Sequence, residues 1–153
     1  MKKSVLLLLA CIAMSCQFIK AQTPLKPRDT TITGPQNFAV VMGISKYKFV
    51  RPLNYADKDA ELFRNYLKSP GGGRLSDDNI YLLLNDQANE TNFQVKFKSW
   101  LKSKKLQKGD RLFMYLASHG DAIDKDQFFY LTYDCNPAGD KNNYLLNGAI
   151  RMY

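Results

Sequence analysis

The single histidine of the chain, His119, is the side chain best suited to proton transfer near neutral pH. It follows the apolar segment "RLFMYLA" (111–117), and Ser118 and Gly120 flank it. A small residue and a glycine leave room for a ligand to approach the backbone. A purely structural histidine is the alternative, but this position favours general acid–base chemistry at His119.

Other chemistries lack the residues that they need. Ser45 and Ser118 do not lie in the Gly-x-Ser-x-Gly pattern of a serine hydrolase. One histidine and one cysteine outside the N-terminal segment are fewer ligands than zinc requires. Glycines 71–73 lack the Gly-Lys-Ser/Thr ending of a phosphate loop. The lysines and arginines are scattered apart from a group at 98–108, which we interpret as a solvated face, so nucleic acid is not expected as a partner.

Apolar patterning predicts alternating strands and helices. Continuous apolar runs predict buried strands at 37–45, 79–85 and 111–117. Apolar residues on one helical face predict helices over 55–69 and 90–105, and Thr91 and Gln94 have the spacing of a capping box. Strand, helix, strand, helix, strand is typical of an α/β fold with a parallel sheet.

The carboxyl ends of parallel strands share one edge of the sheet, where α/β proteins carry their sites. This rule brings three segments together: Ile44–Lys46, Asn85–Asp86 and Ser118–Gly120. Farther along, the sequence predicts a polar loop from Asp121 to Gln127, a strand or hairpin arm at 128–134 and a turn region at 136–143. His119 is therefore expected at the functional edge.

Residues 1–21 have the parts of a secretory signal peptide: Lys2 and Lys3, an apolar run from Val5 to Ile12, and the tripeptide Ile19-Lys20-Ala21. The run is too short for a comfortable membrane span. We expect cleavage after Ala21, export to the periplasm or the exterior, and no stable membrane span afterwards.

Cleavage at this point would remove Cys11 and Cys16, leaving Cys135 and no internal disulfide, and would lower the net charge from +8 to +5. Lipoprotein anchoring through Cys16 is the alternative, although Ala13 stands where leucine is usual. Residues 22–36, with three prolines and no apolar period, are predicted to be a linker, and residues 37–153 the folded domain.

Five segments, in their order and spacing, resemble the catalytic large-subunit domain of the caspase and metacaspase peptidases: "FAVVMGISKY", "LNYADKDAELFRNYL", "NIYLLLNDQA", "DRLFMYLASHGD" and "FYLTYD". The resemblance spans residues 38–134. Its most specific element is the strand that ends in Ser-His-Gly, supported by the Leu-x-x-Ala-x-x-Asp-Ala pattern over 53–60. It implies a three-layer sandwich with a mainly parallel sheet.

The resemblance also implies a function, a cysteine endopeptidase that acts on protein or peptide substrates with a Cys–His dyad. His119 matches the dyad histidine, and Gly120 matches the residue whose N–H serves the oxyanion hole. Asp59 matches an aspartate of the pocket for an arginine or lysine before the scissile bond, although Lys58 replaces the usual asparagine. A solvated aspartate in the first turn of a helix is the alternative for Asp59.

The cysteine nucleophile of the family follows the histidine by about 50 residues, on the next parallel strand. This count places it beyond Tyr153, so we expect the sheet to be incomplete on its C-terminal side. Cys135 lies only sixteen residues after His119 and is interpreted as an incidental thiol. The alternative function is a non-catalytic caspase-like protein-interaction module.

Four aspartates crowd the segment after His119: Asp121, Asp124, Asp126 and Asp134. Carboxylate oxygens suit calcium, and some metacaspase-like enzymes bind calcium near this segment. The spacing is not that of a calcium loop, so a polar loop tip is the preferred interpretation. No cofactor and no metal site are expected, with calcium kept as the alternative.

Overall fold

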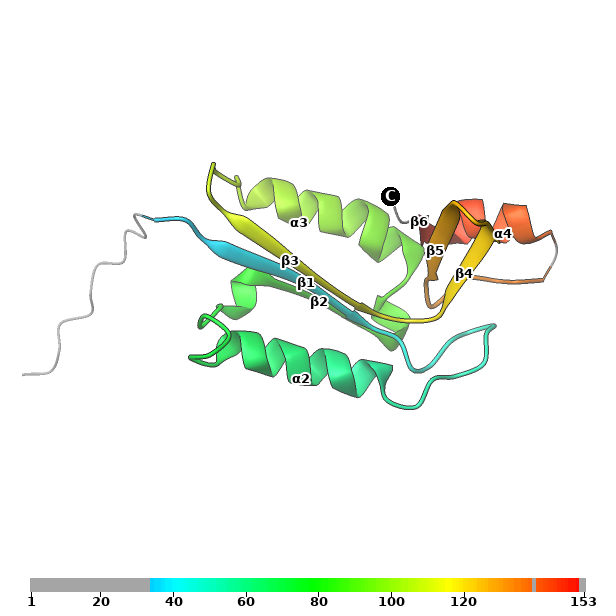
Figure 1. Ribbon diagram of the computed structural model, residues 1–153, viewed down its shortest axis with the longest axis horizontal. Coiled ribbons are helices and arrows are strands. Elements are labelled where there is room, and N and C mark those ends of the chain that lie inside the picture. Colours follow the sequence, from blue (N-terminus) through cyan, green and yellow to red (C-terminus); the bar gives the residue numbers. More distant parts are fainter. Residues whose placement is uncertain (1–33, 139, 152–153) are drawn as a thin grey trace, which may run out of the picture. The chain divides into compact units, whose positions relative to one another are not determined.

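The computed structural model describes residues 34–138 and 140–151. The predicted signal peptide (1–21) and most of the predicted linker (22–36) lie outside the described residues. The helices and strands, labelled in Figure 1, are β1 (Asn37–Gly43), α2 (Ala56–Lys68), β2 (Ile80–Leu84), α3 (Phe97–Ser103), β3 (Arg111–Ala117), β4 (Gly120–Asp124), β5 (Gln127–Leu131), α4 (Lys141–Gly148) and β6 (Ala149–Arg151).

Two small sheets make up the strand framework. In the first, β1 lies between β2 and β3 and pairs with both in parallel, so that Val41 lies opposite Leu82 and Tyr115. In the second, β5 lies between β4 and β6 with antiparallel pairing. The three strands predicted from apolar runs are thus present, and the prediction that they run parallel is confirmed.

Strand β1 is buried on both faces because a helix covers each side of its sheet. Ala39 and Val41 face α2, where they pack with Ala60 and Leu67. The alternate residues of β1 face the other way, into a cluster that contains Phe93, Phe97 and Trp100. Figure 1 shows α2 and α3 on opposite sides of the sheet. The predicted three-layer α/β sandwich is therefore confirmed.

The last residue of β1, Gly43, lies against the first turns of α2. A Cβ atom built at Gly43 would come within 2.3 Å of the Ala56 carbonyl oxygen and 2.5 Å of the Ala60 Cβ. No side chain larger than hydrogen fits at such distances, so glycine lets the helix start directly beside the strand end. This contact determines where the N-terminus of α2 lies relative to the functional edge.

The segment after His119 differs from the prediction. Residues 120–124 form strand β4 instead of a polar loop, since β4 pairs with β5. Asp124 caps the hairpin tip by accepting hydrogen bonds from the Asp126 N–H (2.8 Å) and the Gln127 amide (2.9 Å). The polar composition that predicted a loop thus reflects a hairpin that is partly exposed.

The predicted turn region at 136–143 is also only partly a turn. Helix α4 begins at Lys141, and the Asp140 side chain accepts a hydrogen bond from the Asn143 N–H at its N-terminus. Aspartate is a favoured N-cap residue, so its turn propensity at this position serves to start a helix.

The capping box predicted at Thr91 and Gln94 is wrong. Asn89 caps this helix instead, because its side chain accepts a hydrogen bond from the Asn92 N–H at 2.9 Å. Gln94 bonds to the Glu90 carboxylate, and a π-helical turn over Asn92–Lys96 precedes α3. The helix begins at Glu90, about two turns before α3, so Thr91 lies inside it and not at its cap.

Strand β3 has one strand neighbour among the described residues, β1. Its side chains alternate between the two helical layers, with Tyr115 stacked on Phe63 of α2. Met114 faces the opposite layer and is 54% exposed, so α3 leaves part of its side of the sheet uncovered.

Among the described helices, none is long and apolar enough to cross a membrane.

We predict that Gly43→Ala destabilises the fold by about 1–3 kcal/mol or more, because the added methyl group overlaps the backbone of α2. Urea unfolding of the chain measures this loss. Gly34→Ala is the matched control, since nothing lies within 4 Å of a Cβ at Gly34. Equal stability of the two variants would show that α2 shifts freely away from β1.

Candidate active site

The three segments predicted to share one edge of the sheet do lie together. The Asn85 side-chain oxygen accepts hydrogen bonds from the N–H groups of Ser45 (3.0 Å) and Lys46 (2.9 Å). The Ile44 N–H donates to the Ala117 carbonyl at 2.9 Å. Asn85 has a positive φ of 47°, a conformation that asparagine tolerates better than most residues. The ends of β1, β2 and β3 are thus tied directly to one another.

A carboxylate from α2, Asp57, joins this edge. One of its oxygens accepts from the Ser45 hydroxyl (2.7 Å), and the other accepts from the Asn85 side-chain amide (3.0 Å). The Asp57 N–H in turn donates to the Ser45 hydroxyl at 3.0 Å. We call Ser45, Asp57 and Asn85 the edge network.

The hydrogen bonds of the edge network favour the charged form of Asp57. The Asn85 amide, and after it the Ser45 hydroxyl, hold the pKa of the Asp57 carboxyl below its ordinary value. The position of Asp57 in the first turn of α2 also suits a negative charge. The network is therefore anionic and ordered near neutral pH.

The backbone of His119 is anchored on both sides. Its N–H donates to the Tyr47 hydroxyl at 2.8 Å, and its carbonyl accepts from the Leu131 N–H at 2.9 Å. The rings of Tyr47 and His119 also contact each other, with centroids 5.1 Å apart. Burial raises the pKa of Tyr47 to about 12, so its hydroxyl stays neutral and can accept the bond. Tyr47 thus couples the loop after β1 to the residue after β3.

The imidazole ring of His119 is oriented by a backbone carbonyl. Its Nε2 atom lies 2.9 Å from the carbonyl oxygen of Arg51. A carbonyl oxygen can only accept, so Nε2 carries the proton and Nδ1 of the neutral ring is left as the basic nitrogen. The ring is half-buried and is therefore both held in place and accessible.

Gly120 is exposed and opens β4. Because the His119 carbonyl accepts from Leu131, the alternation of an antiparallel ladder directs the Gly120 N–H away from β5. A backbone donor in this direction is available to an anionic group beside His119. His119 and Gly120 therefore present two neighbouring polar groups: the Nδ1 atom of the imidazole ring and a backbone N–H that does not bond to β5.

Asp59 lies in the first turn of α2, as Asp57 does, but it is exposed. Its carboxylate has no hydrogen-bond or ion-pair partner among the described residues. Residues two apart in a helix lie on different faces, which is why Asp57 reaches the edge network and Asp59 does not. The partly buried pocket expected around Asp59 is not formed by the described residues.

Cys135 is fully buried in a cluster with Phe129, Leu131 and Ala149. Burial, together with the negative charge of Asp134, raises the pKa of the Cys135 thiol to about 11. A thiol of this kind is protonated near neutral pH and is a poor nucleophile. Its environment agrees with the interpretation of Cys135 as an incidental thiol.

Three of the four aspartates after His119 have separate side-chain contacts. Asp121 pairs with Lys141 (2.8 Å), and Asp124 caps the β4–β5 hairpin. Asp134 accepts from the Thr132 hydroxyl (2.9 Å). Within the described part of the chain, no group of three or more histidine, cysteine, aspartate or glutamate side chains is arranged to hold a metal ion.

Three groups of this site were not predicted from the sequence: Asp57, Tyr47 and the Arg51 carbonyl. Asp57 carries a weak signal, since it lies in the same helical turn as Asp59. Tyr47 follows the predicted edge segment closely enough to be a candidate by position. The carbonyl of Arg51 has no signal at all, because every residue has the same group and only the path of the loop places it.

A scan against protein-family models matches residues 36–148 to the caspase domain, peptidase family C14. The match covers most of the chain, including β1, the edge network, His119 and Gly120. A search of curated proteins finds no matching relative.

We predict that Asp57→Asn lowers the free energy of unfolding at pH 7 by about 1–3 kcal/mol, the usual value of hydrogen bonds to a charged group. The amide places an NH₂ group opposite either the Ser45 hydroxyl or the Asn85 amide. Urea unfolding measures the loss, and Asp59→Asn, in the same turn, is the control with an expected change below about 0.5 kcal/mol.

The effect of Asp57→Asn should depend on pH. The pKa of Asp57 is lower in the folded than in the unfolded chain, so its contribution is complete above the unfolded value of about 4. It is lost as the pH falls below that value toward the folded pKa. The difference between wild type and variant should therefore shrink below about pH 4; a difference that stays constant there would contradict the charge-based account.

Proposed function

We propose that this chain, which belongs to the caspase domain family, carries the histidine part of a cysteine-type endopeptidase. The observation that carries the proposal is the orientation of His119. Its Nε2 atom is held by the Arg51 carbonyl (2.9 Å), and its backbone N–H by Tyr47 (2.8 Å). A ring fixed in this way presents Nδ1 for proton transfer, the task of the histidine in a Cys–His dyad.

The proposed chemistry is acyl transfer. A cysteine thiolate attacks the carbonyl carbon of the scissile peptide, and the His119 imidazolium donates a proton to the leaving amine. The Gly120 N–H, directed away from β5, supports the negative charge that develops on the carbonyl oxygen. Water then attacks the thioester, with His119 as the base, and releases the acid product and the thiol.

We infer that the nucleophile of this reaction is not Cys135. That thiol is buried, and its pKa is raised to about 11. The proposed nucleophile is a cysteine that follows residue 153 in the whole protein, on a strand that pairs with the open edge of β3. The second candidate function is a non-catalytic interaction module. The buried thiol of Cys135 favours this function if no cysteine of this kind follows.

The substrates in this proposal are proteins or peptides cleaved after arginine or lysine. Asp59 supports the proposal because it is an exposed carboxylate without an intramolecular partner among the described residues, at the turn of α2 that begins beside the functional edge. A guanidinium or ammonium group pairs well with such a carboxylate. Because residues 1–21 are predicted to be a signal peptide, we propose that the substrates are cleaved in the periplasm or outside the cell.

We predict that purified residues 22–153 do not hydrolyse reporter peptides that end in arginine or lysine, since Cys135, the cysteine of the described residues, is a buried thiol whose pKa is raised to about 11. Cys135→Ala should leave this baseline unchanged. Release of the fluorescent reporter group is the measurement. Activity that both Cys135→Ala and His119→Ala abolish would identify Cys135 as the nucleophile and contradict the proposal.

A longer product, extended beyond residue 153 to include the proposed cysteine, tests the enzyme itself. We predict that His119→Ala abolishes its peptidase activity, whereas a product that is folded but inactive in its wild-type form would favour the interaction module. In this product, Asp59→Ala should lower kcat/KM for basic reporters about 10–100-fold, the value of one charge-assisted pair.

The control for Asp59 is Glu61→Ala, which removes another carboxylate from the same helix and should leave the residue preference unchanged. Thermal unfolding should show no loss of stability in Asp59→Ala, because Asp59 has no partner among the described residues. Equal turnover of basic and neutral reporters by the wild-type product would refute the role of Asp59.

A further inference from the structure

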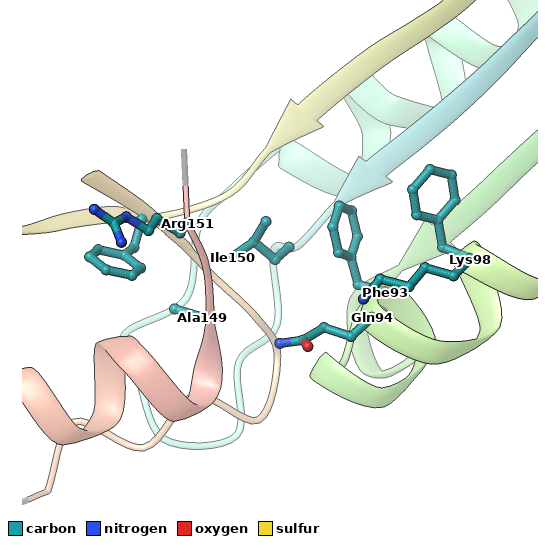
Figure 2. A pocket seen from close by; sticks show the side chains of 8 residues that line it. Phe93, Gln94, Lys98, Ala149, Ile150 and Arg151 are labelled. Carbon is teal, nitrogen blue, oxygen red and sulfur yellow. The ribbon is translucent and has the colours of Figure 1, made fainter. Parts of the chain in front are cut away.

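A groove follows α3 and the helical turn that precedes it. One pocket of about 440 Å³ lies between the helix and the second sheet, with Phe93, Gln94 and Lys98 on one side and Ala149 and Ile150 on the other. Figure 2 shows these residues facing one another across the pocket. A second pocket of about 410 Å³ is lined by Lys98, Leu101, Lys102, Lys105 and Leu106. Lys98 lines both pockets, so they form one tract, the α3 groove.

The charge of the α3 groove has one sign. Six lysines and no aspartate or glutamate occur between residues 91 and 109. Within residues 34–138 and 140–151, none of these lysines forms an ion pair. The basic partners of the ion pairs there all lie outside α3. Lys104 contacts the Trp100 ring, 5.4 Å from its centroid, and the lysines that line the groove are Lys98, Lys102 and Lys105.

The floor of the groove is apolar. Phe93 and Phe97 line its first pocket, and Leu101 and Leu106 line its second. Leu106 is 41% exposed, although a leucine at the surface gains stability when it is covered. A binding partner must therefore offer apolar side chains to the floor and negative charges to the lysines along it.

The length of the groove limits the form of the partner. From Phe93 to Lys102 the helical backbone rises about 14 Å, and the tract continues to Leu106. An extended polypeptide of about five residues covers this distance. The first pocket lies between α3 and the second sheet and can take an inserted side chain, whereas a bilayer surface is flat. Nucleic-acid bases need exposed aromatic rings to stack on. The aromatic rings of the groove form its buried or half-buried floor.

We propose that the α3 groove is a docking site for an acidic polypeptide segment with interspersed apolar side chains. Carboxylates pair with Lys98, Lys102 and Lys105, and the apolar side chains cover Leu101 and Leu106. This contact tethers an acidic protein partner on the helical layer and not at His119. It does not depend on peptidase activity, and it holds for the interaction module as well.

The test uses the full chain and a fluorescein-labelled peptide of glutamate, glycine and leucine, with fluorescence anisotropy as the readout. The variant Lys98→Glu with Lys102→Glu and Lys105→Glu should weaken binding at least about tenfold, since each exposed pair contributes up to about 0.5 kcal/mol. Leu101→Ala with Leu106→Ala should also weaken binding. Circular dichroism verifies that both variants are folded.

The matched control is Lys48→Glu with Lys58→Glu and Lys125→Glu, which changes the net charge equally at exposed sites outside the groove. It should keep affinity within about twofold, as general attraction between opposite net charges is screened by salt. A glutamine version of the peptide should bind much more weakly.

Four results would overturn the proposal. They are equal weakening in both triple variants, equal binding of the glutamine peptide, displacement of the peptide by anionic vesicles or duplex DNA at lower concentration than by unlabelled peptide, and a dimer of the chain that the groove variant dissociates. The last result would assign the groove to a second copy of the chain.

Discussion

The close approach of β1 and α2 at Gly43 determines the geometry of the functional edge. Only hydrogen fits where the end of β1 meets the Ala56 carbonyl and Ala60. Since α2 starts there, the Asp57 carboxylate comes within hydrogen-bond distance of Ser45 and Asn85. A larger residue at position 43 would separate the helix from the sheet and pull the edge network apart.

The edge network and the groups that hold His119 have separate roles at the carboxyl ends of the strands. The network holds β1, β2 and α2 together through charged and amide groups. His119 is held by the loop after β1 instead. That loop supplies the Tyr47 hydroxyl and the Arg51 carbonyl, which fix the backbone and the ring of His119. The histidine is therefore oriented by neutral groups, and its ring keeps one nitrogen for chemistry.

The two faces of the parallel sheet are covered by different helices and differ in the groups that they carry. On the α2 side, the ring of Phe63 stacks on that of Tyr115, and α2 supplies Asp57 to the edge network. On the α3 side, Met114 is exposed and lysines line a groove along the helix. The proposed docking at the α3 groove and the proposed chemistry at His119 thus involve different parts of the fold.

The amino-acid sequence alone was enough to predict the alternation of strands and helices, the parallel direction of β1, β2 and β3, and the position of His119 and Gly120 at the end of β3. These follow from apolar runs, helical periodicity and the rule that parallel strands end at one edge, all of which are local patterns. The family resemblance predicted from these segments agrees with the caspase domain match over residues 36–148.

The surroundings of His119 could not be predicted from the sequence and depend on the packing of the folded chain. A backbone carbonyl such as that of Arg51 has no side-chain signature, and the choice of Asp57 over Asp59 depends on which face of α2 the Gly43 contact turns toward the sheet. Strand β4 was hidden for a similar reason: its polar residues pair with β5 only after the chain reverses at Asp124. Long-range packing sets these features, since they join residues whose spacing along the chain says nothing about their distance in space.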